Sequence, residues 1–477
     1  MVHQTGDSAR ARLIEEVRAR CGDKAVVTEP ADVAPWLTDW RGRYRGQADA
    51  ILAPASTEEV AQIVCLAAER GVPLVPQGGN TSMVGGATPP ADGSALILSM
   101  RRMNRIRSLD PDSGTAVAEA GVILAALHDS ALAAGRRFPL TLGARGSCTV
   151  GGLCATNAGG TQVLRFGTMR SLVAGIEAVL PDGSLHNGLS ALKKDNRGYN
   201  LDHLLIGSEG TLGVITAATL RLVPAVNSRA VAWVGVANPQ AALTLLRFCE
   251  ARTDRIEGFE LVAGDSLELV LRHVSATRNP LKGRHPWHVL IEATAETSGT
   301  DPAELLRSLL SNAYEEGMVE DATVSASDVQ VVAFWRIRES ISEAERCEGP
   351  STAHDISVPV AAMPNFIAEA SVAVERAFPG TVASAFGHLG DGNVHFHVRA
   401  GSRAVPDWIE VDGPPITRFV HDLVAAAGGS ISAEHGIGQM KRAELERLAP
   451  PGDLAAMRAI KRAIDPSGMM NPGKLVG

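Results

Sequence analysis

Aromatic side chains are scarce in this chain: Phe, Trp and Tyr make up 4% of its 477 residues, against 48 glycines and 26 prolines. So many residues that favour turns exclude a coiled coil. Hydrophobic residues are still 45% and charged residues 21%, which argues against disorder over long stretches. At roughly 150 residues per domain, the length suggests two to four domains. The composition favours an α/β or α+β enzyme with cores of Ala, Val and Leu.

The chain also lacks a basic character and a long apolar run. There are 45 Lys and Arg against 53 Asp and Glu, a net charge of −8, and no long basic stretch. This balance argues against nucleic-acid binding and against attachment to anionic membranes. No apolar run approaches the roughly 18 residues of a membrane span. The first 22 residues lack the apolar core of a signal peptide. We therefore expect no transmembrane segment and a cytoplasmic location.

Cysteine is rare as well, with six residues that form no C-x-x-C pair. In a long chain without a signal peptide such cysteines are expected to be free thiols. Cys65 falls in the buried period of a predicted helix, so we expect it to be packed rather than catalytic.

The elements alternate between helix and strand. Ser56 and Glu59 form a capping box before a helical period that Gly71 ends. Glycine is dense at 143–160, where we expect irregular backbone, and it becomes less frequent between Pro224 and residue 325. The other expected helices lie at 122–134, 240–251, 303–316, 328–346, 363–377 and over most of 443–475, and the expected strands at 72–76, 95–99, 114–121, 173–180, 213–223 and 288–293.

Three glycine-rich loops, 77–86, 143–160 and 207–213, are the main binding signal of the first half. Successive N–H groups in such loops can form nests for a pyrophosphate, and glycine lets the backbone approach it closely. The alternative is a set of tight turns, but three loops in one region favour a phosphate-bearing cofactor. No G-x-G-x-x-G opens a helix after a strand, so a Rossmann site is not supported.

Histidine is concentrated in the second half, where five of the 13 lie between 388 and 435. His388 and His395 flank a Gly-Asp-Gly turn between two predicted strands, and Glu434 precedes His435 in a later loop. Two imidazoles and a carboxylate are a common ligand set for a divalent metal. The alternative is that these histidines are packed and hydrogen-bonded, and that Glu434 and His435 are solvated.

Five motifs together resemble a known family. They cover nearly the whole chain in the expected order, and they resemble the vanillyl-alcohol oxidase/p-cresol methylhydroxylase superfamily. Within it, the chain is most similar to the FAD-linked D-2-hydroxy-acid dehydrogenases, the branch acting on D-2-hydroxyglutarate in particular. The motifs are at 76–86 (Pro-Gln-Gly-Gly-Asn-Thr-Ser-Met-Val-Gly-Gly), 151–160, 207–216, 387–395 (Gly-His-Leu-Gly-Asp-Gly-Asn-Val-His) and 433–438 (Ala-Glu-His-Gly-Ile-Gly).

The resemblance implies an α+β fold in three parts. These are a two-part FAD-binding domain of the p-cresol methylhydroxylase type at 1–224, an inserted α/β substrate-cap domain at 225–424 that carries the metal site, and a C-terminal helical segment at 425–477 that returns to the FAD domain. The implied FAD-binding residues are Pro76, Gln77, Gly78, Gly79, Asn80, Thr81, Gly85, Gly86, Gly143, Ser147, Gly151, Gly152, Ala155, Thr156, Asn157, Gly160, Glu209, Gly210, Gly213, Val214, Ile215 and Asn471.

The flavin is expected to be dissociable FAD. Some members of the superfamily attach it through a histidine, but residues 76–90 contain none. Cys148 and Cys154 are the only nearby nucleophiles, and small-residue packing accounts for them equally well.

The same resemblance assigns the reaction. It implies His388, His395 and Glu434 as ligands of Zn²⁺ or Mn²⁺, with zinc favoured. His435 is the implied base that takes the proton of the α-hydroxyl while the hydride leaves for flavin N5. The implied substrate-binding residues are Arg338, Ser342, Asn393 and His397.

One position departs from the family pattern. Relatives commonly have a lysine before the Ser-Val-Pro segment, where this chain has Ala353. A cationic contact to a substrate carboxylate is therefore missing, and His397 could compensate for it. D-2-hydroxyglutarate is favoured, with 2-oxoglutarate as product, while D-lactate, D-malate and other D-2-hydroxy acids stay open.

The electron acceptor is expected to be an electron-transfer flavoprotein or a quinone-linked carrier rather than NAD or oxygen. This expectation comes from the resemblance alone. A homodimer is an open alternative to a monomer. A flavin- or metal-binding sensor without catalytic activity is the alternative from another functional class.

Overall fold

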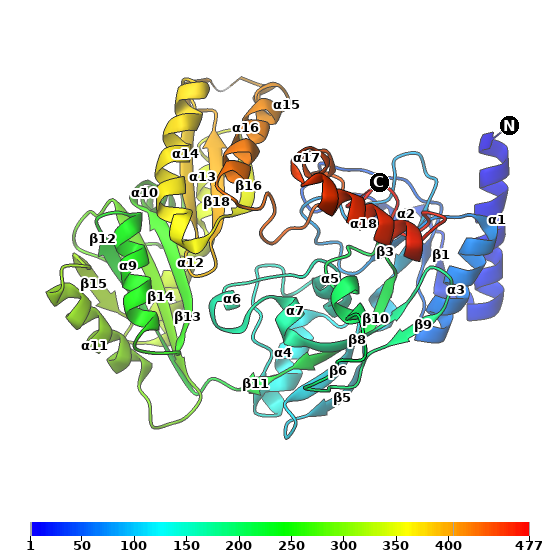
Figure 1. Cartoon of the computed structure of the whole chain (residues 1–477), viewed down its shortest axis with the longest axis horizontal. Coiled ribbons are helices and arrows are strands. Elements are labelled where there is room, and N and C mark those ends of the chain that lie inside the picture. The colour runs from blue at the N-terminus through cyan, green and yellow to red at the C-terminus, as the bar shows by residue number, and fades with distance from the viewer. Residues whose placement is uncertain (1, 404, 477) are drawn as a thin grey trace. The chain divides into compact units, whose positions relative to one another are not determined.

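The computed structural model describes residues 2–403 and 405–476, which divide into two compact units (Figure 1). Unit 1 contains 2–160, 167–225 and 434–476, and unit 2 contains 161–166 and 226–433 without residue 404. Besides the short segment 161–166, the chain passes between units near 225 and 433, whereas the expected divisions were at 224 and 424. The difference at the second division arises because α16 (Gly413–Ala426) and the segment after it still belong to unit 2.

Unit 1 is built on two sheets. One has the order β1-β2-β4-β3, with parallel pairs among its last three strands, and the other has the antiparallel order β5-β6-β10-β8-β9. The strands are β1 (Val26–Val27), β2 (Ile51–Leu52), β3 (Leu74–Gln77), β4 (Leu96–Ser99), β5 (Ile106–Asp110), β6 (Thr115–Glu119), β8 (Val173–Val179), β9 (Leu185–Asn187) and β10 (Val214–Arg221), and a short ribbon pairs β7 (Arg136–Arg137) with β11 (Val223–Pro224).

Helix α3 (Thr57–Arg70) forms as the sequence predicts. The Ser56 hydroxyl accepts a hydrogen bond from the Glu59 N–H at 3.2 Å, and Gly71 ends the helix in the left-handed region at φ 61°. Its apolar face packs against α1 (Val2–Cys21) and the parallel strands. Cys65 is only half-buried, contrary to expectation, because its sulfur lies on the turn at 182–183 rather than in the core.

Unit 2 is built on one seven-stranded sheet with the order β15-β12-β14-β13-β17-β18-β16. Every pairing in it is antiparallel, so this unit is itself α+β. The strands are β12 (Ser228–Val236), β13 (Ile256–Ala263), β14 (Trp287–Ala295), β15 (Asp321–Val324), β16 (Ser351–Ser357), β17 (Val382–His388) and β18 (Asn393–Arg399).

Helices cover both faces of this sheet because its strand residues alternate in direction. One face packs against α9 (Pro239–Glu250), α11 (Pro302–Glu315), α14 (Met363–Ala377) and α16. The other packs against α10 (Gly264–His273), α12 (Asp328–Glu339) and α13 (Ile341–Arg346), and includes Trp233 and Phe386. The candidate site of unit 2 develops on this second face.

Most of the expected elements are found within a few residues of their predicted bounds, with three differences. The run at 143–160 contains the short helix α5 (Val150–Ala155). The expected helix at 328–346 is divided at Ser340 into α12 and α13. The C-terminal region holds only α17 (Arg442–Leu448) and α18 (Pro451–Ile464), because Pro450 and Pro466 each force the preceding residue out of helical geometry.

Further helices of unit 1 lie between its strands in the chain. They are α2 (Pro30–Val33), α4 (Leu124–Ala133), α7 (Met169–Leu172) and α8 (Leu201–Leu205), while α15 (Trp408–Val411) and α6 (Val163–Phe166) belong to unit 2. Arg165 of α6 explains that assignment, since its Nη1 donates to Glu257 at 2.6 Å and to Glu296 at 2.8 Å.

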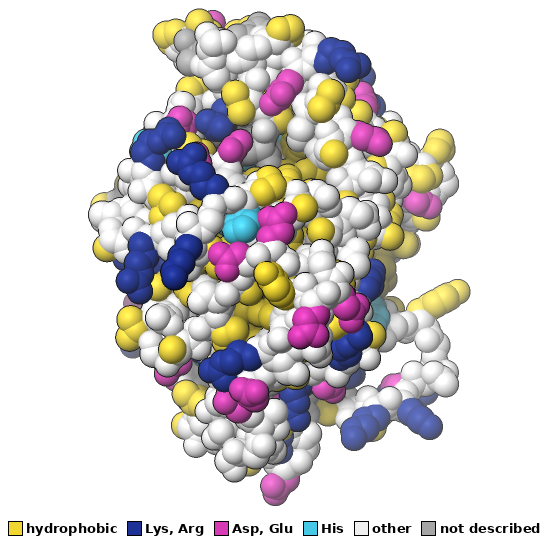
Figure 2. All heavy atoms as spheres, turned by 90° about the vertical axis from the view of Figure 1, so that its left-hand side faces the viewer, with side chains coloured by type: hydrophobic (Ala, Val, Ile, Leu, Met, Phe, Trp, Pro, Cys, Tyr) yellow, Lys and Arg dark blue, Asp and Glu magenta, His cyan; other side chains and the backbone are white. Residues whose placement is uncertain are grey.

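Among the described helices, none combines the length and the apolar character that crossing a bilayer requires. Figure 2 shows one face of the molecule, on which acidic and basic side chains are interspersed with apolar ones.

Candidate functional site

The first two glycine loops pack directly on one another in unit 1. A methyl group on Gly79 would lie 1.8 Å from the carbonyl oxygen of Ser147, and one on Gly78 would lie 2.2 Å from the Thr149 hydroxyl. Gly160 is equally confined, 2.3 Å from the oxygen of Thr141. A side chain at Gly79 or Gly160 would push the backbones apart, so glycine is required at these two positions, while one at Gly78 would displace the Thr149 side chain.

The third loop is joined to the second through backbone hydrogen bonds. The Gly207 N–H donates to Cys154 at 3.0 Å, and the Glu209 N–H donates to Ala155 at 2.8 Å. Asn80, Asn157 and Glu209, one in each loop, all have positive φ, between 48° and 53°. Non-glycine residues rarely adopt this conformation, and such strain is concentrated at functional sites.

Asn471 connects the first and third loops. Its Nδ2 donates to the carbonyl of Gly86 at 2.9 Å and to that of Glu209 at 2.7 Å, and its own N–H donates to Leu74. The structure thus brings the predicted cofactor residues of three loops and the C-terminal segment together. Val214 and Ile215 are buried residues at the start of β10.

The remaining predicted cofactor positions lie in these same loops. A methyl group on Gly210 would lie 3.2 Å from the Pro76 side chain, and one on Gly151 would lie 2.6 Å from that of Ala120. The Thr156 hydroxyl donates a hydrogen bond to the Gly152 carbonyl at 3.0 Å. A methyl group on Gly143 would meet only open space. Thr81, Gly85 and Gly213 complete the set, with positive φ at both glycines.

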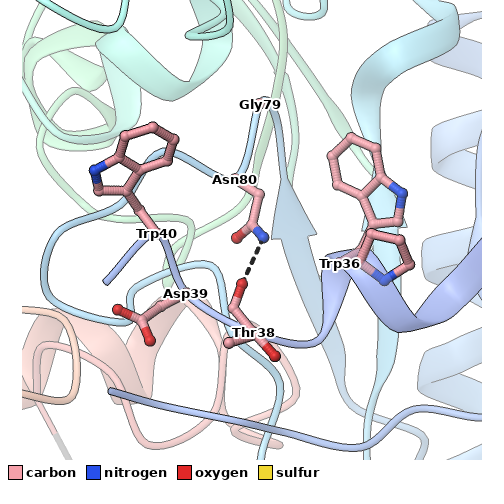
Figure 3. Close-up of a pocket in the computed structure, with 7 residues that line it drawn as sticks. Trp36, Thr38, Asp39, Trp40, Gly79 and Asn80 are labelled. Carbon is pink, nitrogen blue, oxygen red and sulfur yellow. Dashed lines mark hydrogen bonds between the residues drawn. The ribbon is translucent and has the colours of Figure 1, made fainter. Parts of the chain in front are cut away.

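A pocket of about 390 Å³ opens beside the first loop (Figure 3). Its lining comes from Pro35, Trp36, Thr38, Asp39, Trp40, Gly79 and Asn80. The loop amides fix the segment that carries both indoles: Gln77 Nε2 donates to Trp36 and Asn80 Nδ2 donates to Thr38, at 3.0 and 2.8 Å. The Trp40 side chain is 67% exposed.

The thiols near these loops are not activated. Burial raises the pKa of Cys148 to about 11 and that of Cys154 to about 12. Both therefore stay protonated at neutral pH and are poor nucleophiles.

Glu209 has a role beyond the one predicted for it. Its two carboxylate oxygens accept the N–H groups of Ile437 and Gly438, each at 2.7 Å. Burial raises the pKa of Glu209, and these N–H donors oppose that rise. The carboxylate thereby fixes the segment that directly follows Glu434 and His435 in the chain.

The register of unit 2 explains its histidine cluster. Glu260 of β13 pairs with His388 of β17, and His388 pairs with Asn393 of β18. Two residues along, Phe386 pairs with His395, which pairs with Asp355 of β16. Because residues two apart share a face, these side chains lie together. The rings of His388 and His395 are 5.4 Å apart.

Glu260 is the central carboxylate of this cluster. Its Oε1 lies 2.7 Å from His388 Nδ1, and its Oε2 accepts from Arg338 Nε at 2.8 Å. Burial would raise the pKa of Glu260, but the neighbouring His388 and Arg338 outweigh it and hold the pKa below its ordinary value. Arg338 is thus buried and paired with Glu260, and it lies 5.0 Å from the Phe386 ring.

His397 forms a second pair of the same kind. Its Nδ1 hydrogen-bonds Glu345, a carboxylate that also accepts the Ser384 hydroxyl. Burial, with the charges of Arg338 and His388, lowers the pKa of His395 well below its ordinary value. His395 is therefore a neutral imidazole, the form that binds metals.

The other predicted substrate residues lie around this cluster. Asn393 Nδ2 donates to Asp355 at 2.9 Å, while its buried Oδ1 has no hydrogen-bond partner in the described part of the chain. Ser342 is half-buried on α13 rather than on the same helix as Arg338. Ala353 pairs with His397 in the sheet and is exposed.

The segment before Glu434 is held by unit 2. Ser430 forms a bridge with Ser357, with N–H···O distances of 3.0 and 2.8 Å, and the Ala433 N–H donates to Asp355 at 3.3 Å. Glu434 and His435 follow directly as the first residues of the last stretch of unit 1. The metal site predicted from His388, His395 and Glu434 stays a prediction.

Sequence reasoning missed the acidic residues that support the histidines. Glu260, Glu345 and Asp355 are far apart in sequence, and no short motif connects them to positions 388–397. A signal was present at Glu260, which follows Glu257 within the largely apolar segment Ile-Glu-Gly-Phe-Glu-Leu-Val (256–262). A carboxylate inside such a strand predicts a buried ion pair.

Two family models match the chain. Residues 48–188 match the FAD binding domain, and residues 226–475 match the C-terminal domain of FAD linked oxidases. Solved structures agree on the fold: p-cresol methylhydroxylase has a TM-score of 0.77 at 15% identity, over 98% of this chain and 96% of that one. Alkyldihydroxyacetonephosphate synthase has a TM-score of 0.73 at 18% identity, over 97% and 85%. The predicted two-part FAD-binding fold is thereby confirmed.

Curated relatives are more similar in sequence. D-2-hydroxyglutarate dehydrogenase of Xanthomonas citri is 37% identical over 94% of this chain and 93% of its own length. The mitochondrial enzymes of that name from Bos taurus and Arabidopsis thaliana are 38% and 36% identical, over 94% and 95% of this chain and 81% and 80% of their own lengths. The chain therefore belongs to the FAD-linked oxidases and is similar over nearly its whole length to D-2-hydroxyglutarate dehydrogenases.

Proposed function

We propose that this protein is an FAD- and divalent-metal-dependent dehydrogenase that oxidises D-2-hydroxyglutarate to 2-oxoglutarate. The observation that carries the proposal lies in unit 2, where His388, His395 and Arg338 are gathered on one face of the sheet. Imidazoles are metal ligands, and a guanidinium is suited to a carboxylate. The relatives named D-2-hydroxyglutarate dehydrogenase support the choice of substrate.

The glycine loops of unit 1 fit FAD. The atoms Gln77 Oε1, Thr149 Oγ1 and Asn471 Oδ1 are buried and have no hydrogen-bond partner among the described residues. Buried polar atoms are rarely left in this state, which supports a polar ligand beside them. When bound, FAD supplies the hydride acceptor at flavin N5. The high pKa values of Cys148 and Cys154 support the prediction that it is held without a covalent bond.

The donor set of the second site fits a divalent metal. His388 and His395 of unit 2 would hold it, with Glu434 as the third ligand that the family resemblance implies, and it would supply a Lewis acid that eases loss of the α-hydroxyl proton. When His388 is neutral and donates through Nδ1 to Glu260, its Nε2 carries the lone pair that a metal requires. Zinc is proposed first, with manganese as the alternative.

The residues of the chain divide the remaining tasks. Arg338 binds a substrate carboxylate, since a guanidinium has five N–H donors and the ion pair with Glu260 uses only part of them. His435 accepts the proton of the α-hydroxyl. Asn393 and His397 border the substrate, with Ser342 supporting Arg338. The substrate thus loses a proton and a hydride and becomes a 2-oxo acid.

The electron acceptor is proposed to be an electron-transfer flavoprotein or a quinone-linked carrier. A relative named D-2-hydroxyglutarate–pyruvate transhydrogenase, from Saccharomyces cerevisiae and 32% identical, makes pyruvate the competing acceptor to test. The homodimer and the cytoplasmic location stay predictions, and several relatives are named as mitochondrial proteins.

Removal and return of metal tests the mechanism. Chelation is expected to abolish turnover while the visible spectrum of the oxidised flavin persists, and Zn²⁺ or Mn²⁺ is expected to restore turnover. His435→Ala is expected to retain metal and lose about 10²–10⁴-fold in kcat. Full activity in a preparation that elemental analysis finds metal-free would end the metal-dependent mechanism.

Substitution at Ala353 tests the substrate assignment. Ala353→Lys places a cation at the strand position paired with His397. We expect it to raise the ratio of kcat/KM for D-2-hydroxyglutarate over D-lactate, since the second carboxylate gains a charged partner. An unchanged ratio would show that this position does not face the distal carboxylate.

A further inference from the structure

We propose that Glu260 is a positioning residue that sets the tautomer of His388 and the orientation of Arg338 at the same time. One carboxylate would thereby couple the metal ligand to the group that binds the substrate carboxylate. This inference rests on the proposed function, because it concerns the same site.

The geometry assigns one oxygen to each partner. Oε1 lies 2.7 Å from His388 Nδ1, and Oε2 lies 2.8 Å from both Nε and Nη2 of Arg338. Glu260 and His388 are directly opposite each other on β13 and β17, so the sheet fixes their separation. Arg338 arrives from α12 on the same face, with Phe386 beneath its guanidinium.

Only a carboxylate can serve both partners. A carboxylate accepts hydrogen bonds at both oxygens, whereas an amide accepts at its oxygen and donates at its nitrogen. With glutamine, an amide nitrogen facing His388 would donate to Nδ1 and move the ring proton to Nε2. The opposite orientation would point N–H groups at Arg338. Either way one partner loses its orientation.

Burial increases the energetic effect of these hydrogen bonds. Glu260 is 1% exposed, and Arg338 is 8% exposed. In such surroundings each charged hydrogen bond counts for more, and an unmatched donor is costly. A ligand imidazole that is oriented by a carboxylate is typically worth 10–100-fold in metal affinity. Glu260 is therefore expected to affect metal affinity and substrate KM together.

The test compares wild type with Glu260→Gln and Glu260→Asp. Glutamine retains the side-chain length and loses one acceptor, while aspartate retains the charge and loses the reach to both partners. For each, Zn²⁺ affinity is measured by competition with a chromophoric chelator, without turnover, and KM is measured for D-2-hydroxyglutarate. Glu260→Asp is expected to lose about 10–100-fold in Zn²⁺ affinity and to raise KM about tenfold or more, and Glu260→Gln is expected to show at least one of these two losses.

Glu292→Gln is the matched control. Glu292 lies on the neighbouring strand β14, is 8% exposed and accepts a hydrogen bond from Trp335 Nε1. Its substitution is expected to leave Zn²⁺ affinity and KM unchanged. Flavin content and melting temperature of each variant establish that it is folded, and the aspartate variant decides the matter if the glutamine variant does not fold.

The outcomes separate the inference from the proposed function. If wild type binds Zn²⁺ and oxidises the substrate, and a folded Glu260 variant equals it in Zn²⁺ affinity and KM, the inference is overturned and the function stands. If wild type itself binds no Zn²⁺ and oxidises no hydroxy acid, the proposed function fails and the inference falls with it.

Discussion

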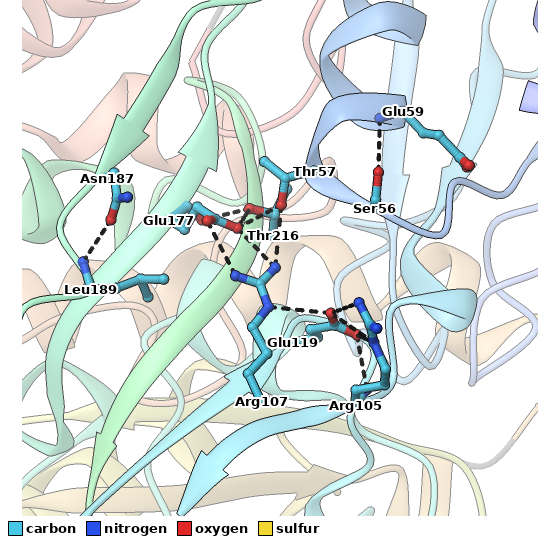
Figure 4. Close-up of polar contacts among 10 residues, drawn as sticks. All are labelled: Ser56, Thr57, Glu59, Arg105, Arg107, Glu119, Glu177, Asn187, Leu189 and Thr216. Carbon is cyan, nitrogen blue, oxygen red and sulfur yellow. Dashed lines mark hydrogen bonds and ion pairs between the residues drawn. The ribbon is translucent and has the colours of Figure 1, made fainter. Parts of the chain in front are cut away.

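Two networks, one in each unit, join buried carboxylates to arginines and have different properties. In unit 1, Glu119 accepts from Arg105 and Arg107, and Glu177 accepts from Arg107 (Figure 4). The hydroxyls of Thr57 and Thr216 complete Glu177, at 2.6 and 2.7 Å. In unit 2, Glu260 is shared by Arg338 and His388.

The difference lies in what the partners can still bind. Arg107 donates to both carboxylates of unit 1 through Nε, Nη1 and Nη2, so its guanidinium is largely used within the network. In unit 2 an imidazole replaces one of the arginines, and an imidazole held at Nδ1 presents a lone pair at Nε2. The first network stabilises a sheet, while the second also presents groups that bind ligands.

The largest change is expected in kcat/KM, where substitutions of Arg338 and Arg107 should differ. Arg338→Ala is expected to lower kcat/KM by about 2–5 kcal/mol, roughly 30- to 5,000-fold, the scale for truncating a buried charge pair. Arg107→Ala, measured where it is folded, is expected to change kcat/KM by less than about twofold, because its partners belong to the structural network. Equal losses in the two variants, measured with D-2-hydroxyglutarate in steady-state assays, would abolish the distinction.

The next effect is on stability. Arg107→Ala removes charged hydrogen bonds from both Glu119 and Glu177 and is expected to lower the free energy of unfolding by about 1.5–3 kcal/mol. Arg107 is partly exposed, so the loss is expected to stay below that of a fully buried pair. Urea denaturation measures the change, and a neutral result would show that the Thr hydroxyls and Arg105 suffice.

The smallest effect concerns how the melting temperature decreases at acidic pH. Burial would raise the pKa of Glu119 and Glu177, but hydrogen bonds from the arginines outweigh it and hold both pKa values below the ordinary 4.5. A lowered pKa gives stability that is present above pH 4.5 and lost as the pH falls through the folded value. Glu177→Gln is therefore expected to flatten the decrease in melting temperature below about pH 4.5. A variant whose melting temperature decreases with acidity as steeply as that of wild type would contradict this.

The sequence predicted the local elements of the site well and its long-range contacts poorly. The Ser56 cap, Gly71 and the His388–His395 turn depend on neighbours within a few residues, and the structure has them as expected. The pairing of Glu260 with His388 joins residues 128 apart in sequence. That pairing depends on strand order in the sheet, which a periodicity cannot supply.

Arg338 illustrates the same limit. The expected helix at 328–346 contains both Arg338 and Ser342, but α12 ends before Ser342 and the guanidinium turns to a buried carboxylate of β13. The resemblance implies Glu209 as a cofactor residue, and its hydrogen bonds to Ile437 and Gly438 could be seen only in three dimensions. The roles of both residues toward ligands stay predictions.

The reductive half-reaction shows whether this protein oxidises a D-2-hydroxy acid. The purified holoprotein is mixed anaerobically with D-2-hydroxyglutarate, its L-enantiomer, D-lactate and D-malate in turn, while the visible band of oxidised flavin is followed. We expect D-2-hydroxyglutarate to bleach the band fastest and the L-enantiomer to leave it unchanged. If the holoprotein contains metal and oxidised flavin and none of these acids bleaches the band, the protein is not such a dehydrogenase, and a sensor without catalytic activity is indicated.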